Sequence, residues 1–253
     1  MVPKVCRIVC IAPLLALMGC ALGDQRPGSG NVVESTAMSA AVSAEAVSDF
    51  RSAASNWEIL YRQHPDDPAF ALKLARALRY SGQVQPSIDT AAGFLDRHAA
   101  NPALLTELGK DYLAGDRLGL AVRTLRQAAQ AAPGDWEPLS ALAVALDYQH
   151  DHGEAQQVYG RALALAPDNP VLLNNLGLSL AEAGDLKSAE ATLMKAVDQP
   201  RATAQVRQNL ALIKALAGDA TAAERLARQD LPPEAVRSNG VYYRSLADGV
   251  RLR

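Results

Sequence analysis

A leucine recurs at one fixed interval along most of this chain, and a glycine or alanine follows it each time. The pairs are Leu74-Ala75, Leu108-Gly109, Leu142-Ala143, Leu176-Gly177 and Leu210-Ala211. Such a period, of about 34 residues, is typical of a unit of two antiparallel helices that stacks against copies of itself. One such unit cannot bury its apolar face alone, so the period predicts a helical stack rather than a globule with one central core.

Further positions repeat in the same register. Small residues predicted to separate neighbouring units stand at Ala121, Ala155, Ala189 and Ala223. Glycines expected in turns recur at Gly82, Gly184 and Gly218, whereas Gly115 comes one place early and His150 takes this position in the third unit. The pattern resembles tetratricopeptide (TPR) repeats. We therefore predict an all-α TPR helix-hairpin solenoid of about five repeats plus an N-terminal helix, with repeats at 68–101, 102–135, 136–169, 170–203 and 204–237.

Composition agrees with close-packed helices, since 49% of the residues are apolar and only 5% are aromatic. The chain has 25 basic and 27 acidic side chains. Without residues 1–19, which include Lys4 and Arg7, the ratio becomes 23 to 27. The repeats thus lack the excess of positive charge that binds nucleic acids, and we expect no nucleic-acid partner.

The first residues look like a lipoprotein signal peptide, 1–19. Two cations precede an apolar run at 8–18, which is too short to span a bilayer, since a spanning helix takes about 20 residues. The run ends in Leu17, Met18, Gly19 and Cys20, which resembles the bacterial lipobox. Cys20 would be the only cysteine left after cleavage, and lipidation would explain an unpaired thiol. An ordinary cleaved signal with an incidental Cys20 is the alternative.

Lipoprotein sorting offers a further expectation. Residue 21 is Ala21 and not aspartate, which by resemblance to sorting rules indicates a lipid anchor in the outer membrane, on the periplasmic side. Residues 20–42 are rich in Gly, Ser, Ala and Asn and predict a flexible tether. Residues 43–67 predict one helix that begins at Ser43 and covers the end of the stack.

The C-terminal part departs from the repeat. Lys214 replaces an apolar residue, and Asp230 replaces an alanine, so the fifth repeat is degenerate. The remaining residues, 238–253, form a tail. The sequence leaves open whether Tyr242 and Tyr243 pack onto the last helix or stay free.

One cluster has metal-ligand residue types, namely His150, Asp151 and His152 with Asp147 and Glu154 nearby. It falls on an expected turn, where polar residues are normal, and no distant third ligand is indicated. We therefore favour a solvated turn over a metal site. No phosphate loop or nucleophile motif occurs either, so we expect no catalytic residue, no metal, no small-molecule substrate and no cofactor apart from the lipid.

The first helix of each pair should line a concave groove that binds protein segments. The side chains predicted to face it are Lys73, Arg76, Tyr80, Glu107, Lys110, Ser140, Val144, Tyr148, Asn174, Asn175, Leu178, Gln208 and Leu212. Amides and cations can bond a peptide backbone, while Leu and Val contact its side chains. The adjacent Asn174 and Asn175 are the strongest candidates.

Several stretches, together with the lipobox, resemble one family more closely than TPR repeats in general. They lie at 139–147, 174–180, 206–212 and 230–234. The resemblance is to TadD, the TPR lipoproteins of Tad (Flp) pilus assembly systems. It implies a pilotin-like assembly factor that binds the pilus secretin or another component of the Tad machinery. The alternative is a general envelope adaptor that recruits peptidoglycan hydrolases or other assembly factors.

Overall fold

The computed structural model describes residues 29–98 and 101–251, and all regular structure in them is helical. The signal peptide, the lipobox and Cys20 lie outside the described residues. The helices are α1 (Ser29–Ala46), α2 (Phe50–Gln63), α3 (Pro68–Tyr80), α4 (Val84–Arg97), α5 (Pro102–Ala114), α6 (Leu118–Ala131), α7 (Trp136–Tyr148), α8 (His152–Leu165), α9 (Pro170–Glu182), α10 (Leu186–Val197), α11 (Ala204–Leu216), α12 (Ala220–Ala227) and α13 (Pro233–Arg251). The predicted all-α TPR solenoid is confirmed.

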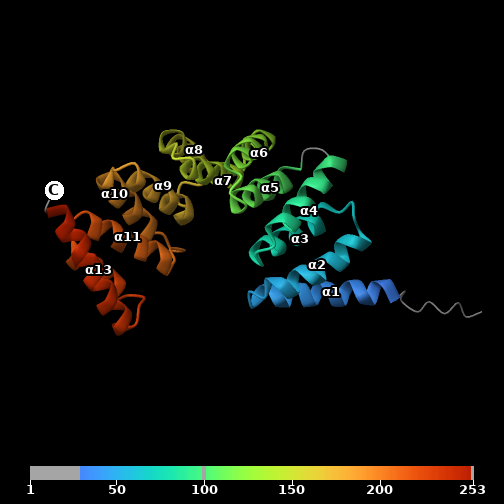
Figure 1. Cartoon of the computed structure of the whole chain (residues 1–253), viewed down its shortest axis with the longest axis horizontal. Coiled ribbons are helices and arrows are strands. Elements are labelled where there is room, and N and C mark those ends of the chain that lie inside the picture. The colour runs from blue at the N-terminus through green and yellow to red at the C-terminus, as the bar shows by residue number, and fades with distance from the viewer. Residues whose placement is uncertain (1–28, 99–100, 252–253) are drawn as a thin grey trace, which may run out of the picture.

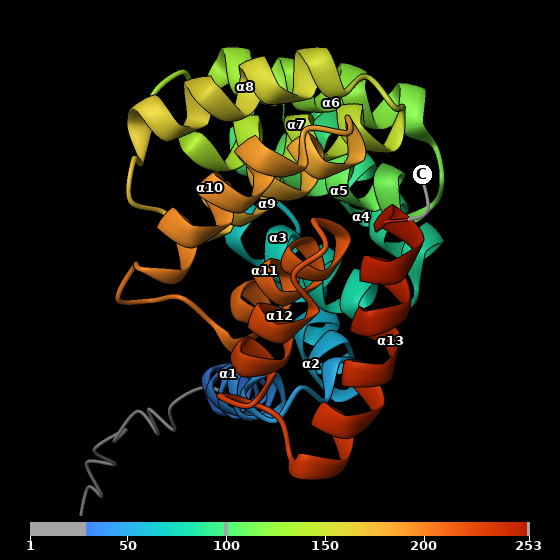
Figure 2. The same cartoon turned by 90° about the vertical axis from the view of Figure 1, so that its left-hand side faces the viewer.

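The helices form a curved stack of antiparallel pairs, with α1 at one end, α7 near the middle and α13 at the other end (Figure 1). Each helix packs on the next one in the chain, and the first helices of successive pairs also contact one another: α3 with α5, α5 with α7, α7 with α9 and α9 with α11. Within the described part of the chain, the second helices make no comparable contacts with each other. In the perpendicular view α6 and α8 lie on the outside of the curve (Figure 2). The first helices therefore form its inner surface.

The turns between paired helices explain the period. Among the described residues, every residue with a positive φ stands at the same position of the repeat. These residues are Ser48 (59°), Gly82 (81°), Asp116 (56°), His150 (60°), Gly184 (89°) and Gly218 (92°). A left-handed residue closes each first helix and reverses the chain, which favours Gly and tolerates Asp or Ser at some cost. Gly115, at φ −91°, is the helix cap, and Asp116 takes the left-handed place.

The N-terminal prediction was wrong for the described residues. Residues 29–42 are not a flexible tether, and 43–67 are not one helix, because α1 runs to Ala46 and a turn at Ser48 separates it from α2. Ala41 and Ala53 are buried and lie one repeat period before Ala75 and Ser87, so α1 and α2 are a pair in the repeat register. The composition of α1 suggested disorder, but packing of its alanines against α2 stabilises it as a helix.

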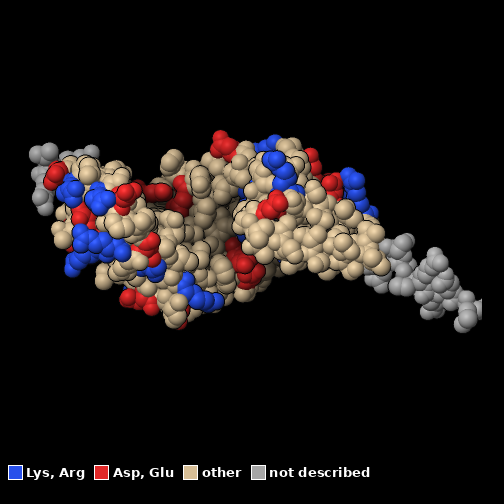
Figure 3. All heavy atoms as spheres, turned by 90° about the horizontal axis from the view of Figure 1, so that it is seen from below, with Lys and Arg blue, Asp and Glu red and all other residues tan. Residues whose placement is uncertain are grey.

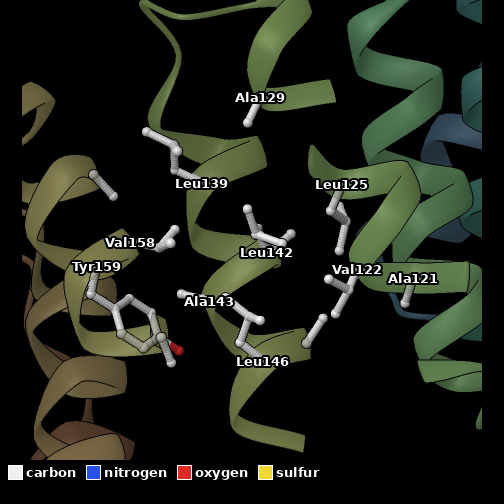
Figure 4. Close-up of a cluster of buried hydrophobic side chains, with 14 of the residues drawn as sticks. Ala121, Val122, Leu125, Ala129, Leu139, Leu142, Ala143, Leu146, Val158 and Tyr159 are labelled. Atoms are coloured by element: carbon white, nitrogen blue, oxygen red, sulfur yellow. The ribbon is translucent and has the colours of Figure 1, made fainter. Parts of the chain in front are cut away.

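Small residues determine how closely the helices of one pair approach. A Cβ atom on Gly109 would lie 2.4 Å from Cγ of Leu125, and one on Gly177 would lie 2.6 Å from Cγ of Leu193. The predicted alanines at 121, 155, 189 and 223 are all fully buried. The largest core cluster joins α6, α7 and α8, with Leu125, Leu142, Leu146, Val158 and Tyr159 directed toward one another (Figure 4).

The C-terminal boundary was also wrong. No tail begins at residue 238, because α13 starts at Pro233 and packs along α11 and α12. Tyr243 is buried at 4% exposure, whereas Tyr242 is 55% exposed, which settles the alternative that the sequence left open. The two polar departures of the fifth repeat are paired: Lys214 Nζ lies 2.6 Å from Glu190 Oε1, and Asp230 Oδ2 accepts a 2.8 Å bond from Arg207 Nε.

Candidate binding groove

A cavity of about 710 Å³ opens where α7, α8 and α9 meet, and we call it the α7–α9 pocket. It is lined by Val144, Asp147, Tyr148, His150, His152, Tyr159, Asn175, Leu178, Ser179 and Glu182. Its volume lies in the range of about 300–1,000 Å³ that is usual for ligand sites. Four predicted groove residues, Val144, Tyr148, Asn175 and Leu178, are brought together here.

Asp147 is the centre of a polar network in this pocket. Its Oδ1 accepts a 2.6 Å hydrogen bond from Ser179 Oγ of α9 and lies 2.9 Å from His152 Nδ1 of α8. Burial raises the pKa of the Tyr159 hydroxyl, and the nearby negative charge of Asp147 raises it further. The network joins three helices and holds the Asp147 carboxylate in a defined position.

Glu182 supplies the distant group that the sequence did not indicate. Its Oε2 lies 3.8 Å from His152 Nδ1, and single ligand atoms of Asp147, His152 and Glu182 all lie within 4.8 Å of one another. The other two acids of the predicted cluster act elsewhere: Asp151 caps α8, and Glu154 pairs with Arg126 at 2.6 Å. The repeat register could have located Glu182, since it stands one period after Tyr148.

Two predicted groove residues, Arg76 and Glu107, belong to a different structure, a buried ion network. Glu107 is 1% exposed, and its Oε1 accepts bonds of 2.9 and 2.6 Å from Arg79. Arg76 Nε lies 3.5 Å from the other oxygen. The placement of Glu107 on an open groove was therefore wrong: its carboxylate is enclosed by arginines that link α3 to α5. Sequence reasoning missed Arg79.

Asp111, one turn after Glu107, is also fully buried in this network. Its Oδ1 lies 3.2 Å from Arg79 Nε, but this contact lacks hydrogen-bond geometry. Burial raises the pKa of Asp111 to about 7 and the charge of Glu107 adds to this effect, while the neighbouring Ser87 hydroxyl and the charge of Arg79 oppose it. Two carboxylates thus share one largely enclosed guanidinium, and no pattern in the sequence indicated this arrangement.

The first predicted groove residues face α1 and α2. Lys73 Nζ lies 3.4 Å from Glu45 Oε2 and 5.5 Å from the centroid of the Trp57 ring. Tyr80 is exposed, with its ring 4.8 Å from that of Phe50. These contacts tie the added N-terminal pair to the stack.

The asparagine pair divides into two roles. Asn174 is buried, and its Oδ1 accepts a 2.8 Å bond from Asn209 Nδ2 of α11, so it links α9 to α11 and is not an open groove residue. Asn175 lies in the α7–α9 pocket and accepts a 3.1 Å bond from Asn174 Nδ2. Ser140 is buried as well. The remaining predicted positions, Lys110, Gln208 and Leu212, are partly exposed and lie outside the pocket, and Gln208 donates to Asp230 at 3.4 Å.

Comparison with known proteins gives the family. Two tetratricopeptide repeat models match this sequence, one at residues 38–103 and the other at 148–213. The chain belongs to the tetratricopeptide repeat family. Such proteins are typically scaffolds for protein–protein interactions, and no catalytic family is indicated.

Individual relatives support the fold. An uncharacterized protein of Sinorhizobium fredii, y4yS, is 36% identical over 99 residues, which are 39% of this chain and 53% of that protein. The match thus spans about half of that relative. TTC0263, a TPR protein of Thermus thermophilus, superposes with a TM-score of 0.64 at 21% identity, over 71% of this chain and 98% of its own. YrrB, described as a TPR protein with an unusual peptide-binding site, superposes with a TM-score of 0.53 at 15% identity, over 75% of this chain and 98% of its own.

Within the described residues, none of the helices of this TPR protein is both long and apolar enough to cross a membrane.

Proposed function

We propose that this TPR protein is an outer-membrane lipoprotein that serves as an assembly factor for a Tad (Flp) pilus. The support for the anchor is the charged-then-apolar leader ending in Leu17-Met18-Gly19-Cys20. The support for the pilus is the resemblance of the later repeats to TadD. The observation that carries the binding role is the α7–α9 pocket, because it lies in the stretch of strongest resemblance and has both apolar and polar walls.

The mechanism we propose is pilotin-like. The lipid on Cys20 keeps the solenoid at the outer membrane, while the pocket and the adjoining inner surface capture a segment of the secretin. Tethering raises the effective concentration of the captured segment at that membrane. Val144 and Leu178 would contact its side chains, and the Asn175 amide would bond its backbone.

The test is a pull-down from detergent-solubilised envelopes with three forms of the protein: native, Cys20→Ala, and the pocket variant Asn175→Ala/Leu178→Ala. Asn174 stays unchanged because it links α9 to α11. A matched control is Gln157→Ala/Leu165→Ala, which removes similar residue types from exposed positions of α8 outside the pocket.

Recovery of a secretin with the native and control forms, its loss with the pocket variant, and its failure to reach the outer membrane with Cys20→Ala would support the proposal. Recovery of peptidoglycan hydrolases or other envelope proteins in place of pilus components would remove the pilus assignment and favour the general adaptor.

A further inference from the structure

We propose that the α7–α9 pocket binds a basic side chain, arginine in preference to lysine, of an extended protein segment. This inference rests on the proposed role of the groove in partner binding. It adds the chemistry of the residue that the pocket selects.

The carboxylates of the pocket lack a lysine or arginine partner among the described residues. Across the first helices and their neighbours, buried or half-buried acids are paired with arginine or lysine: Glu45 with Lys73, Glu107 with Arg79, Glu190 with Lys214 and Asp230 with Arg207. In the described residues, the ion pairs of Asp147 and Glu182 are with His152 alone. No lysine or arginine is among the described residues that line the pocket.

The two carboxylates are placed for an incoming cation. The bonds from Ser179 and His152 hold Asp147, whereas the Glu182 side chain is 60% exposed and free to turn toward a guest. Seen from below, the middle of the molecule is hollowed, its floor is mostly uncharged, and acidic side chains stand at its edges (Figure 3). A negative site inside a concave surface attracts cationic groups, and the concavity reduces their screening by water.

The other walls fit the stem of such a side chain. Val144 and Leu178 stand one repeat apart on α7 and α9 and are both partly buried, which provides an apolar surface for the methylene groups. Tyr148 is 62% exposed at the rim and can place its ring against a guanidinium. The planar guanidinium can pair with a carboxylate through two bonds, which is why we expect arginine to bind more tightly than lysine.

A bare metal ion fits less well. The ligand atoms of Asp147 and His152 already face each other at 2.9 Å, and Ser179 bonds the same oxygen. An ion would have to break these contacts, whereas a guanidinium can pair with Glu182 and approach Asp147 while they persist.

The test uses a set of acetylated and amidated heptapeptides made of Ala, Ser and one Leu, with one variable central residue: Arg, Lys, Gln or Glu. Binding to the purified full-length protein in detergent is measured by calorimetry at low and high salt. We expect the Arg peptide to bind at least tenfold more tightly than the Gln and Glu peptides, Lys to lie between them, and the preference to shrink at high salt.

Glu182→Gln should reduce the Arg preference at least fivefold and leave binding of the Gln peptide unchanged. The matched control is Glu137→Gln, because Glu137 is exposed on α7 outside the pocket, and it should keep the full preference. Asp147→Asn should act like Glu182→Gln, with circular dichroism to verify that the helices persist.

Three results would overturn the inference: equal affinity for Arg and Gln peptides, a preference that survives Glu182→Gln, or tight binding of Zn²⁺ that excludes the Arg peptide. Its failure is distinct from failure of the proposed function. If the protein captures a secretin and Glu182→Lys does not impair this capture, the pilus role stands and the basic-residue site is wrong. If the pocket binds Arg peptides selectively but no pilus component is recovered, the basic-residue site stands and the pilus role is wrong.

Discussion

At the scale of single residues, four of the helix pairs match the size of a residue on the first helix to the size of one on the second. Where the first helix has glycine, the second has leucine: Gly109 faces Leu125, and Gly177 faces Leu193. Where the first helix has Ala75 or Ala211, the second has alanine at 91 or 227. The rule is limited to these four pairs, since Tyr159 stands at the equivalent place in the pair of Ala143 and Trp57 in the pair of Ala41. In the two glycine repeats, the small residue is matched to the leucine that it faces.

Gly109→Ala should therefore destabilise the protein, by about 1–3 kcal/mol, because the new methyl group overlaps Leu125. In a Leu125→Ala background, which alone costs about 2–5 kcal/mol, the same change should cost far less, since it recreates the Ala–Ala pair of the first repeat. Urea unfolding of the wild type, both single variants and the double variant measures the coupling. Additive losses would contradict the matched-pair explanation.

At the scale of a single element, α5 is unusual because it buries two carboxylates one turn apart. Glu107 and Asp111 share the guanidinium of Arg79, and Arg76 lies at the edge. A paired charge compensates the burial of Glu107, but at Asp111 the effect of burial outweighs the favourable contacts with Ser87 and Arg79. This helix accordingly contains a group whose ionisation opposes folding.

The consequence is a dependence of stability on pH. Burial raises the pKa of Asp111 to about 7, so between about pH 4 and pH 7 the folded state holds a proton that the unfolded state has lost. The contribution of Asp111 to the free energy of unfolding falls as pH rises through this window. Above pH 7 the buried carboxylate is ionised, and its full destabilising effect is reached. Asp111→Asn should raise the melting temperature at pH 8 and change it little at pH 4.

Calorimetric melting at several pH values tests this expectation. Asp96→Asn, an exposed acid-to-amide change on α4, serves as the control and should leave the pH profile unchanged. Parallel profiles for Asp111→Asn and the wild type would show that Asp111 does not titrate as inferred.

At the scale of the whole molecule, the stack is a linear series of helix pairs, each held mainly by its neighbours. In such a series stability is local, and the ends need a cover. At the C-terminal end α13 provides it: Val236 and Tyr243 pack against the alanines of α11 and α12. The second helix of the fifth predicted repeat has only 8 residues. This repeat thus depends on α13, most of which lies beyond the repeats.

Tyr243→Ala should destabilise this end selectively. We expect amide exchange in α11 and α12 to accelerate by at least tenfold, because a buried aromatic ring is lost, while exchange in α5 to α8 stays unchanged. Hydrogen exchange followed by mass spectrometry resolves the two regions. Tyr242→Ala is the control, since this neighbour is exposed. A uniform acceleration along the chain would contradict the local view of stability.

The parts that sequence reasoning predicted correctly are those in which the period is visible. Leu74 and its equivalents located five pairs, and Gly82 marked a turn that recurs one period later at Asp116 without glycine. The first pair was missed because Ala40 occupies the leucine position. The helix α13 was missed because it begins at the second of two adjacent prolines and does not repeat. Composition and local propensity do not report burial against a distant helix, which decides both cases.

The candidate site was predicted only in part for a similar reason. A face of a helix can be read from spacing, so Val144 and Leu178 were expected on the concave side, and both line the α7–α9 pocket. Their role in binding a partner stays a prediction. Charge pairing between repeats cannot be read in this way. Glu107 and Glu182 are both acids of first helices, yet arginines enclose Glu107, whereas Glu182 stands open beside a histidine. Only the packed structure distinguishes an acidic side chain that pairs with arginine inside the protein from one that is accessible to a partner.

The start of α1 at Ser29 limits how far the solenoid can reach. Only residues 21–28 lie between Cys20 and this helix. A chain of that length spans at most roughly 30 Å when fully extended, and about 16 Å as a random coil. If Cys20 carries the proposed lipid, this short segment would keep the α1 end of the solenoid close to the bilayer. Binding would then take place near the membrane surface, because the anchor would limit how far the groove can move from the bilayer.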